Sequence, residues 1–246
     1  MPVSFTQIMN IARSGMLTRL TSLDTISDNL SNIQTPGFKR GRTNFQELLN
    51  QSQLGGSQIS STQFMMTQGQ LKRTENSLDL AIRGKGFFAL TLPDGRTAYT
   101  RDGQFYLDAQ RRIVNADGFP LDWEGEIPEG AEDVHVNPDG AVMVLRAGAW
   151  SEAGRIELAH FANPSGLLRY GQNLWLETEI SGEAQTGAPG EEERGVILAK
   201  AIEQSNVNLA EEMVNLSSLQ RSFEMSLRVF QQTDEMLSQA IHLRRG

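Results

Sequence analysis

A long apolar stripe near the C-terminal end constrains this chain more than any other feature. From residue 209 to residue 241, ten positions follow one another at alternating steps of four and three without a slip. This spacing aligns side chains along one side of an α-helix and is typical of a coiled-coil seam. Asn208, followed three residues later by Glu211, predicts the helix start. The Asn208 side chain would cap the first backbone N–H groups, and the Glu211 side chain would bond back to the Asn208 N–H. Eight of the ten positions are apolar and two are polar; they are Leu209, Met213, Leu216, Gln220, Phe223, Leu227, Phe230, Asp234, Leu237 and Ile241.

A second amphipathic helix is expected over residues 5–33, with an apolar residue at every seventh position. The motif Thr35-Pro36-Gly37 ends it, because Pro36 lacks a backbone donor and Gly37 tolerates a positive φ. Helices of this length with an apolar seam are not stable alone in water, so each must pack against something. The seams are covered either within one molecule or by other copies, and we favour other copies because few helical residues elsewhere cover them. The repeat positions are Met9, Met16, Leu23 and Leu30, with Ala12, Ile26 and Ile33 beside them.

The middle of the chain lacks the helical repeat of the two ends. Residues 50–63 are polar and predict a linker or an extended ribbon, while residues 78–175 contain short apolar runs typical of strands. Four Asp-Gly pairs punctuate these runs and predict successive hairpins. Residues 195–202, GVILAKAI, predict a last strand. The four pairs are Asp94-Gly95, Asp102-Gly103, Asp117-Gly118 and Asp139-Gly140.

The expected fold class is therefore α+β, with long terminal helices forming a coiled-coil inner domain and a central β-rich domain of short antiparallel strands. The domain boundaries that follow are an N-terminal helix over 1–35, a linker or ribbon over 36–76, a β-rich domain over 77–200 and a C-terminal helix over 201–246, pairing with residues 1–35.

Composition excludes several function classes. The formal charge of −8 argues against general affinity for nucleic acid or an anionic membrane, and the absence of cysteine excludes disulfides and thiolate chemistry. No apolar run is long enough to span a bilayer, and the N-terminus lacks the pattern of a cleaved secretion signal.

Candidate chemical motifs are weak. Gly84-Lys85-Gly86 has the letters of a dinucleotide fingerprint but precedes a strand rather than a helix, which favours a bulge or tight corner. The three histidines have no partners at metal-ligand spacing, and the carboxylate run 191–193 lacks the spacing of a cation cage. We therefore expect no catalytic residue, no cofactor and no metal site.

Three segments together resemble the bacterial flagellar basal-body rod and hook family. They are ISDNLSNIQTPGFKRGRTNFQELL, NSLDLAIRGKGFFALTLPDGRTAYTRDGQF and SNVNLAEEMVNLSSLQRSFEMSLRVFQQTDEML, which cover both ends and the middle of the chain. The resemblance implies a structural subunit, not an enzyme, of a hollow helical rod that carries torque from motor to hook. It also implies export by the flagellar type III apparatus with an uncleaved N-terminus, and a periplasmic location in the basal body. Within the family the distal rod type is favoured over the proximal type, although residues 43–76 are shorter than is usual for the distal type.

The resemblance also indicates assembly residues. The seam positions would contact other helices, Gln220 and Asp234 would set register or line the axial channel, and the N-terminal motif would form the joint between inner helix and outer domain. Lys39, Arg40 and Arg42 are expected to face acidic neighbours, so reversing their charge should weaken assembly and leave the monomer folded. The candidate residues are Met16, Leu23, Ile26, Leu30, Asn29, Asn32, Thr35, Gly37, Phe38, Lys39, Arg40, Leu216, Gln220, Phe223, Leu227, Phe230, Asp234 and Leu237.

The implied partners are copies of the chain itself, other rod and hook proteins and the surrounding ring proteins, with no nucleic acid and no direct membrane insertion. An alternative from another class is a non-flagellar β-domain binding module with helical oligomerisation tails. A third hypothesis, a protein that lies on a membrane surface, is disfavoured by the acidic charge.

Overall fold

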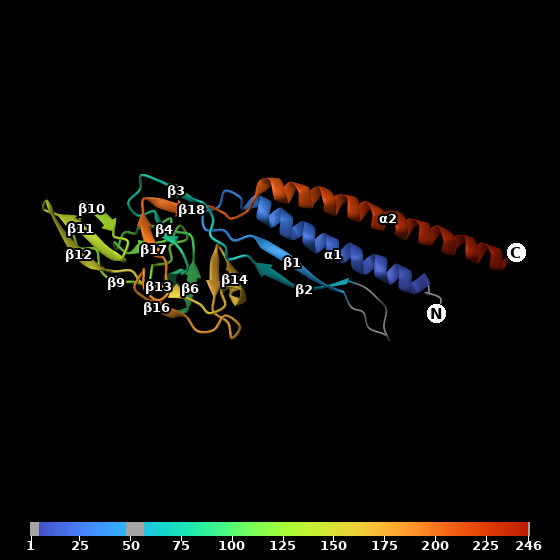
Figure 1. The fold of residues 1–246 in the computed structure, drawn as a ribbon, viewed down its shortest axis with the longest axis horizontal. Coiled ribbons are helices and arrows are strands. Elements are labelled where there is room, and N and C mark those ends of the chain that lie inside the picture. The colour runs from blue at the N-terminus through green and yellow to red at the C-terminus, as the bar shows by residue number, and fades with distance from the viewer. Residues whose placement is uncertain (1–4, 48–56, 246) are drawn as a thin grey trace. The chain divides into compact units, whose positions relative to one another are not determined.

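The computed structural model describes residues 5–47 and 57–245, and the side chains of residues 13–44 and 62–236 among them. It has two α-helices and a β-rich central region of antiparallel strands, so the α+β class is confirmed (Figure 1). The chain forms two compact units. The first, the helical unit, comprises residues 1–32, 40–65 and 207–246; the second, the β-rich unit, comprises residues 33–39 and 66–206.

The helical unit contains α1 (Phe5–Ser31), α2 (Leu209–Arg245) and an antiparallel ribbon of β1 (Gly41–Glu47) and β2 (Ser57–Phe64). The two helices lie side by side, and both strands of the ribbon contact α1 (Figure 1). The polar segment expected as a linker or ribbon thus forms a strand over residues 57–64; residues 48–56 lie outside the described part. In the described part of the chain, no helix is long and apolar enough to cross a membrane.

The start of α2 confirms half of the expected capping arrangement. The Asn208 Oδ1 accepts hydrogen bonds from the backbone N–H groups of Ala210 (2.9 Å) and Glu211 (3.4 Å). The Glu211 carboxylate does not complete the box: it accepts from the Arg40 Nη1 at 2.7 Å. An arginine beside the helix start therefore replaces the predicted reach-back, because an ion pair competes for the same carboxylate.

The β-rich unit is built from short strands in two four-stranded sheets and four two-stranded pairs. The larger sheets have the orders β10-β11-β12-β9 and β14-β15-β6-β5; the pairs are β17-β4, β18-β3, β13-β16 and β7-β8. A single 3-10 turn, η1 (Pro164–Gly166), lies among the described strands. The strands are β3 (Leu71–Arg73), β4 (Leu80–Arg83), β5 (Phe88–Thr91), β6 (Thr97–Thr100), β7 (Tyr106–Leu107), β8 (Ile113–Val114), β9 (Glu124–Gly125), β10 (Asp133–Val136), β11 (Ala141–Arg146), β12 (Ala149–Arg155), β13 (Leu158–His160), β14 (Leu168–Gly171), β15 (Leu174–Leu176), β16 (Gln185–Gly187), β17 (Val196–Ala199) and β18 (Ala201–Glu203).

One apolar cluster forms the core of this unit and draws side chains from both larger sheets. Phe88 and Phe105 are fully buried, and their rings meet edge to face at 5.3 Å between centroids. Val142, Val144 and Ile156 belong to the same cluster and are also fully buried. The β-rich unit therefore has the kind of core that the helical unit lacks among its described side chains.

The Asp-Gly pairs divide into three kinds. Asp94-Gly95 joins β5 to β6 and Asp139-Gly140 joins β10 to β11, and both connect hydrogen-bonded strands as predicted. Asp117-Gly118 makes a tight turn closed by the bond from the Asn115 N–H to the Phe119 carbonyl, at 3.0 Å. Asp102-Gly103 is not a hairpin: β6 and β7, which flank it, do not pair, and a Cβ on Gly103 would overlap the Leu80 carbonyl oxygen. Close backbone approach, rather than a turn, requires this glycine.

The Gly84-Lys85-Gly86 segment is a corner between β4 and β5, as predicted. Gly84 has a φ of +116°, and a Cβ there would lie 2.9 Å from the Gly195 Cα. Gly86 also has a positive φ, +126°. No helix opens from this segment, so it lacks the geometry that binds a pyrophosphate.

Candidate assembly interface

The fully buried side chains on the described parts of the two helices are polar. In the described part of the helical unit, the buried polar residues are Thr18, Ser22, Asn29, Glu212 and Thr233, and none of the helical apolar residues from 209 to 236 is fully buried. The Ser22 and Thr233 hydroxyls each donate to the carbonyl four residues earlier in their own helix. In the described part of this unit the helices thus fully bury polar rather than apolar side chains, opposite to the arrangement in an ordinary folded core.

The predicted seam residues lie in this unit and are only half covered. Leu23 and Phe223, with Leu20, Leu219, Gln220 and Arg19, line one small cavity, so the structure brings the two seams together there. Leu23 and Leu227 remain 36% and 37% exposed, while Gln220 and Asp234 are exposed. The partly buried members are Met16, Ile26, Leu30, Leu216, Phe223 and Phe230; the side chain of Leu237 lies outside the described residues.

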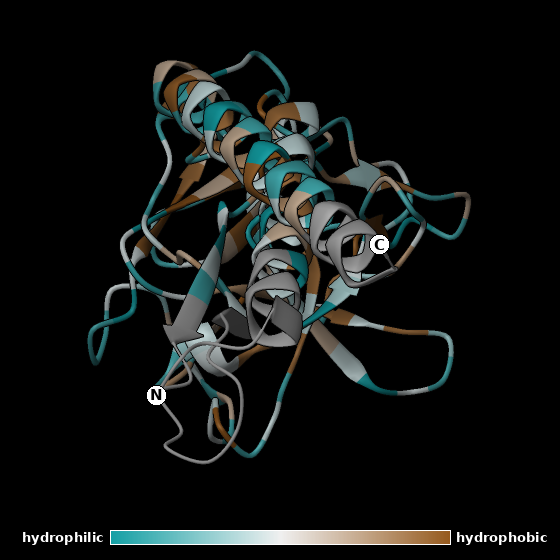
Figure 2. Ribbon diagram, turned by 90° about the vertical axis from the view of Figure 1, so that its right-hand side faces the viewer, coloured by the Kyte–Doolittle hydropathy of each residue, from teal (hydrophilic) through white to brown (hydrophobic). Residues whose placement is uncertain are grey.

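A second apolar stripe on α2 was missed by the sequence analysis. Val214, Met225, Val229 and Met236 follow one another at intervals of 11, 4 and 7 residues, which places them on one side of the helix. Their side chains are 66%, 62%, 48% and 52% exposed. In Figure 2, hydrophobic and hydrophilic stretches alternate along α2, as expected where apolar residues occupy more than one side of a helix. The signal was present in the sequence but was masked by the more regular seam.

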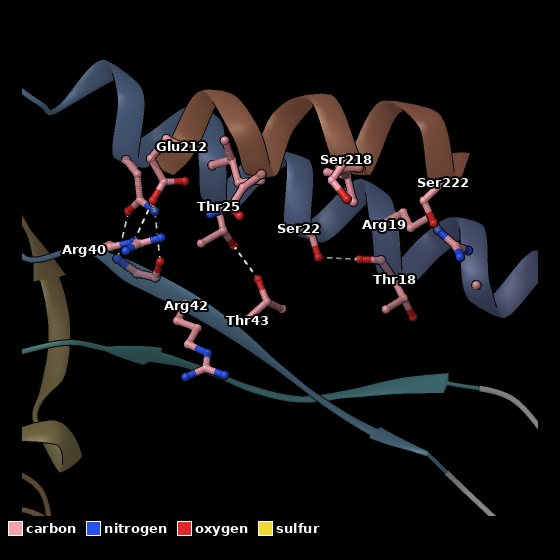
Figure 3. Close-up of a pocket in the computed structure, with 16 residues that line it drawn as sticks. Thr18, Arg19, Ser22, Thr25, Arg40, Arg42, Thr43, Glu212, Ser218 and Ser222 are labelled. Atoms are coloured by element: carbon pink, nitrogen blue, oxygen red, sulfur yellow. Dashed lines mark hydrogen bonds and ion pairs between the residues drawn. The ribbon is translucent and has the colours of Figure 1, made fainter. Parts of the chain in front are cut away.

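A groove of about 570 Å³ lies between α1, α2 and β1 (Figure 3). Its walls carry hydroxyl, amide and guanidinium groups, several of them already bonded to each other. The Arg19 Nε donates to the Ser222 hydroxyl at 2.8 Å, and the Thr43 hydroxyl donates to that of Thr25 at 3.1 Å. Arg42 points away from the helices in Figure 3 and its side chain makes no hydrogen bond or ion pair with a described residue. This groove suits hydrogen bonding to a polar chain segment and holds no pairing of a nucleophile with a base.

The end of α1 is tied to β1 by Asn29, one of the predicted motif residues. The Asn29 side chain is buried; its Oδ1 accepts from the Gly41 N–H at 2.8 Å and its Nδ2 donates to the Gly41 carbonyl at 2.9 Å. Arg40 lies beside this bridge and pairs with Glu211 at 2.7 Å and with the buried Glu212 at 2.6 Å. Asn32 closes the helix end by donating to the Asp28 carbonyl at 2.9 Å.

The other motif residues belong to the β-rich unit. The Gly37 N–H donates to the Glu203 carbonyl at 2.7 Å, and its φ of +69° is the left-handed conformation expected for this glycine. Phe38 is buried, with the Arg169 guanidinium 5.3 Å from its ring centre. The Thr35 carbonyl accepts from the Phe38 N–H at 3.4 Å. These contacts make the joint part of the packed β-rich unit.

Lys39 requires a correction. It has the acidic partner expected of it, because its Nζ pairs with Glu203 at 2.5 Å, but the pair is buried inside the β-rich unit, where the Lys39 side chain is 1% exposed. The Lys39 Nζ also donates to the Thr67 carbonyl at 3.0 Å. Burial lowers the pKa of Lys39, and the Glu203 carboxylate opposes that shift. Reversing this charge would therefore disturb the fold of the β-rich unit itself, contrary to the expectation that the monomer would be unaffected.

Glu203 organises a buried ionic cluster that the sequence analysis did not find. Besides Lys39, it accepts from the Gly69 N–H at 2.8 Å and from the Arg101 Nη1 at 3.3 Å. Arg101 also donates to the Gly84 carbonyl at 2.9 Å and lies 5.1 Å from the centre of the Phe87 ring. The last predicted strand ended at residue 202, one position before Glu203, so no sequence signal identified this residue; in the structure it is the last residue of β18 and is buried. Among the described residues, no group of carboxylate or histidine side chains is placed to hold a metal ion.

Comparisons with known proteins cover both units. Residues 9–39 match the family described as flagella basal body rod protein, residues 81–144 match the flagellar hook protein FlgE/F/G D1 domain, and residues 198–243 match the flagellar basal body rod FlgEFG protein C-terminal family. Each of these three matches overlaps one of the segments on which the resemblance was based.

Several curated relatives are similar over nearly their whole length. The flagellar basal-body rod protein FlgG of Caulobacter vibrioides is 37% identical, over 97% of this chain and 99% of the relative. FlgG of Borreliella burgdorferi is 37% identical, over 95% of this chain and 97% of the relative. FlgG of Buchnera aphidicola from Acyrthosiphon pisum is likewise 37% identical, over 95% and 98%. Relatives of this kind are structural rod proteins rather than enzymes, and they do not favour the alternative of a non-flagellar binding module. The chain therefore belongs to the flagellar basal-body rod protein family, as a structural subunit of the FlgG, or distal rod, type.

Proposed function

We propose that copies of this chain assemble into a hollow helical rod that transmits torque from the motor to the hook. In this proposal α1 and α2 form a coiled-coil inner domain, drawn from residues 1–35 and 201–246. Residues 77–200 form the outer domain, and residues 36–76 connect the two. Non-closing contacts between identical subunits generate a helical filament, which is the geometry that a rod requires.

The observation that carries the proposal is the reversed distribution of polarity in the helical unit. Its buried helical residues are polar, whereas Leu17, Met213, Val214 and Met225 are about half exposed or more. Full burial of a large apolar side chain contributes roughly 1.5–3 kcal/mol, so covering several half-exposed ones contributes several kcal/mol per copy. Part of that gain is offset by the entropy lost on association.

Two apolar sides on α2 support a position among several helices. One side carries the seam residues Leu216, Phe223, Leu227 and Phe230, and the other carries the stripe that begins at Val214. A helix that is apolar on more than one side is stable only when neighbours surround it. We assign the seam residues, including Met16, Ile26 and Leu30 on α1, to contacts in the rod. Gln220 and Asp234 are exposed, and we assign them to register or to the channel.

The proposal extends to partners and route. Neighbouring rod and hook proteins and the surrounding ring proteins are the partners, besides the chain's own copies. The basal body is the site of the family, and we propose that the chain reaches the periplasm through the flagellar type III apparatus with its N-terminus intact.

A matched pair of substitutions on α2 tests this function. Met225→Glu places a charge on the exposed apolar stripe, and Gln231→Glu places the same charge at an exposed polar position of the same helix. We expect Met225→Glu to abolish concentration-dependent polymerisation in sedimentation velocity and motility in cells, while Gln231→Glu preserves both. Polymerisation of the Met225→Glu protein at the native concentration would contradict the proposed burial of this stripe.

A further inference from the structure

The solvent side of the sheet β10-β11-β12-β9 carries a small apolar cluster with an exposed tryptophan. Val134, Val142 and Val144 point into the core, so the alternate residues of the same strands point outward. On that outward side, Leu145 lies opposite Trp150 across the β11–β12 pair, and the Trp150 side chain is 49% exposed. The Trp150 ring lies 6.5 Å from the ring of His135, between centroids. An aromatic and aliphatic cluster on the outer side of a sheet is unusual unless something docks there.

The sheet that carries this cluster is rich in carboxylates. Residues 122–155 contain eight acidic and two basic residues, a net charge of −6 in a chain whose total is −8. All eight acidic residues are exposed. Only Glu129 and Glu152 pair with an arginine of the described chain, at 4.0 Å and 3.5 Å. We call this surface the acidic face; it includes Trp150 and the carboxylates of Glu124, Glu126, Glu132, Asp133 and Glu152.

A complementary surface lies elsewhere in the same unit. Lys72 and Arg73 lie on β3, and Lys200 lies between β17 and β18, where its carbonyl accepts from the Thr74 N–H at 2.8 Å. All three basic side chains are exposed, and none forms an ion pair with a described residue. Strand β3 pairs only with β18 among the described strands, so its other edge is open. We call this surface the basic edge; Glu75 is the carboxylate nearest to it in the sequence.

Cations on an open edge strand have a simpler explanation, because lysine on an edge discourages unwanted pairing between strands. That explanation accounts for the basic edge but not for the acidic face, which combines carboxylates with an exposed tryptophan near the turn between β11 and β12. A contact between the acidic face and the basic edge would explain the charges on both surfaces. Within one molecule the two surfaces come near each other only through the bond from the Ser77 hydroxyl to Asp133, at 3.4 Å, and no described ion pair joins the basic edge to the acidic face, so we place the contact between two molecules.

We propose that the acidic face of one copy docks on the basic edge of a second copy. The contact uses two different surfaces, and each molecule keeps one of each free, so it repeats from copy to copy without closing on itself. Carboxylates meeting lysine and arginine set the register and the rate of encounter, while burial of Trp150 contributes most of the affinity. The inference rests on the proposed self-assembly and adds a contact between β-rich units to the contacts of the helices.

Disulfide trapping tests the contact directly, because the chain has no cysteine. Full-length protein carrying Glu152→Cys and Lys72→Cys, exported and assembled in cells, is expected to form a ladder of disulfide-linked multimers after mild oxidation. The control pairs Glu152→Cys with Gln110→Cys, an exposed neutral position outside both surfaces, and is expected to give no ladder. Motile cells whose Glu152/Lys72 protein forms no ladder would overturn the contact and leave the rod function intact.

Charge reversal gives a second, independent measurement on the purified full chain. Lys72→Glu with Lys200→Glu, or Glu124→Lys with Glu126→Lys, should each weaken self-association about tenfold, with a smaller effect at high salt. A chain carrying both reversals should recover association, since the surfaces are again complementary. If all the variants associate as strongly as the native chain, the proposed contact is wrong but the rod function stands. If the native chain itself never associates, the proposed rod function is wrong as well. Loss of binding to another basic flagellar protein, with self-association unchanged, would show that the acidic face serves a different partner and would also overturn the contact.

Discussion

Asn29 and Gly41, twelve positions apart, are joined by two hydrogen bonds: the Gly41 N–H donates to the Asn29 Oδ1 at 2.8 Å, and the Asn29 Nδ2 donates to the Gly41 carbonyl at 2.9 Å. The asparagine amide thereby satisfies both backbone groups of the first residue of β1, as a neighbouring strand would. Asn29 thus fixes Gly41 within the helical unit, while Lys39, two positions earlier, pairs with Glu203 inside the β-rich unit.

Removal of this bridge should loosen the start of β1. We expect Asn29→Ala to destabilise the helical unit by roughly 1–3 kcal/mol, because two buried backbone groups lose their partners. Hydrogen exchange at the Gly41 amide should become faster in the variant than in the native chain. The control is Asn44→Ala, since Asn44 donates only to the exposed Gln63 side chain. Unchanged protection of the Gly41 amide in Asn29→Ala would show that the bridge is dispensable.

Glu203→Gln should be among the most damaging single substitutions in the β-rich unit. It leaves Lys39 and Arg101 buried without their counter-charge, and breaking a buried pair in this way typically costs about 3–5 kcal/mol. Glu193→Gln makes the same chemical change at the exposed pair with Lys85 and should leave the free energy of unfolding nearly unchanged. Denaturant unfolding of the two variants checks the difference, and equal midpoints would refute a stabilising role for the cluster.

Gly37, in the segment that joins the helical unit to the β-rich unit, should not tolerate a side chain. A Cβ at Gly37 would collide with the backbone of Asp102 and lie 2.6 Å from the Arg101 carbonyl carbon, at a φ of +69°. Gly95 has a similar φ, +82°, but open space around it, so Gly95→Ala measures the conformational cost alone, about 1–2 kcal/mol. We expect Gly37→Ala to lower the melting temperature well beyond Gly95→Ala. Equal losses for the two variants would mean that the contact with residues 101–102 relaxes freely.

Asp102 should make the stability of the β-rich unit depend on pH. Burial raises the pKa of Asp102 from 3.8 to about 6, so the folded chain binds a proton between these values that the unfolded chain has lost. Stability from this group is therefore highest below pH 4 and falls as the pH rises through 6. Asp102→Asn keeps an acceptor for the Gln104 N–H and should stabilise the unit at pH 7 by up to about 3 kcal/mol. Its advantage over the native chain should disappear near pH 4; a constant advantage across this range would exclude the proposed titration.

Local patterns were enough to predict much of this molecule. The repeat of four and three predicted α2, Asn208 predicted its start, and two of the Asp-Gly pairs predicted hairpins, because each signal acts within a few residues of the backbone it shapes. Most of α2 and the Asp94-Gly95 hairpin lie in segments that also carried the family resemblance.

Tertiary structure decided which side chains are buried, because burial depends on residues far apart in the chain. Lys39 and Arg40 are neighbours with the same charge, yet Lys39 is buried against Glu203, 164 positions away, whereas Arg40 pairs with Glu211 and Glu212 at the start of α2. Likewise, the sequence showed an apolar seam on α2 but not that the residues buried in the helical unit would be polar. Periodicity identifies the sides of a helix, and only the packing of the other elements determines which of those sides is covered.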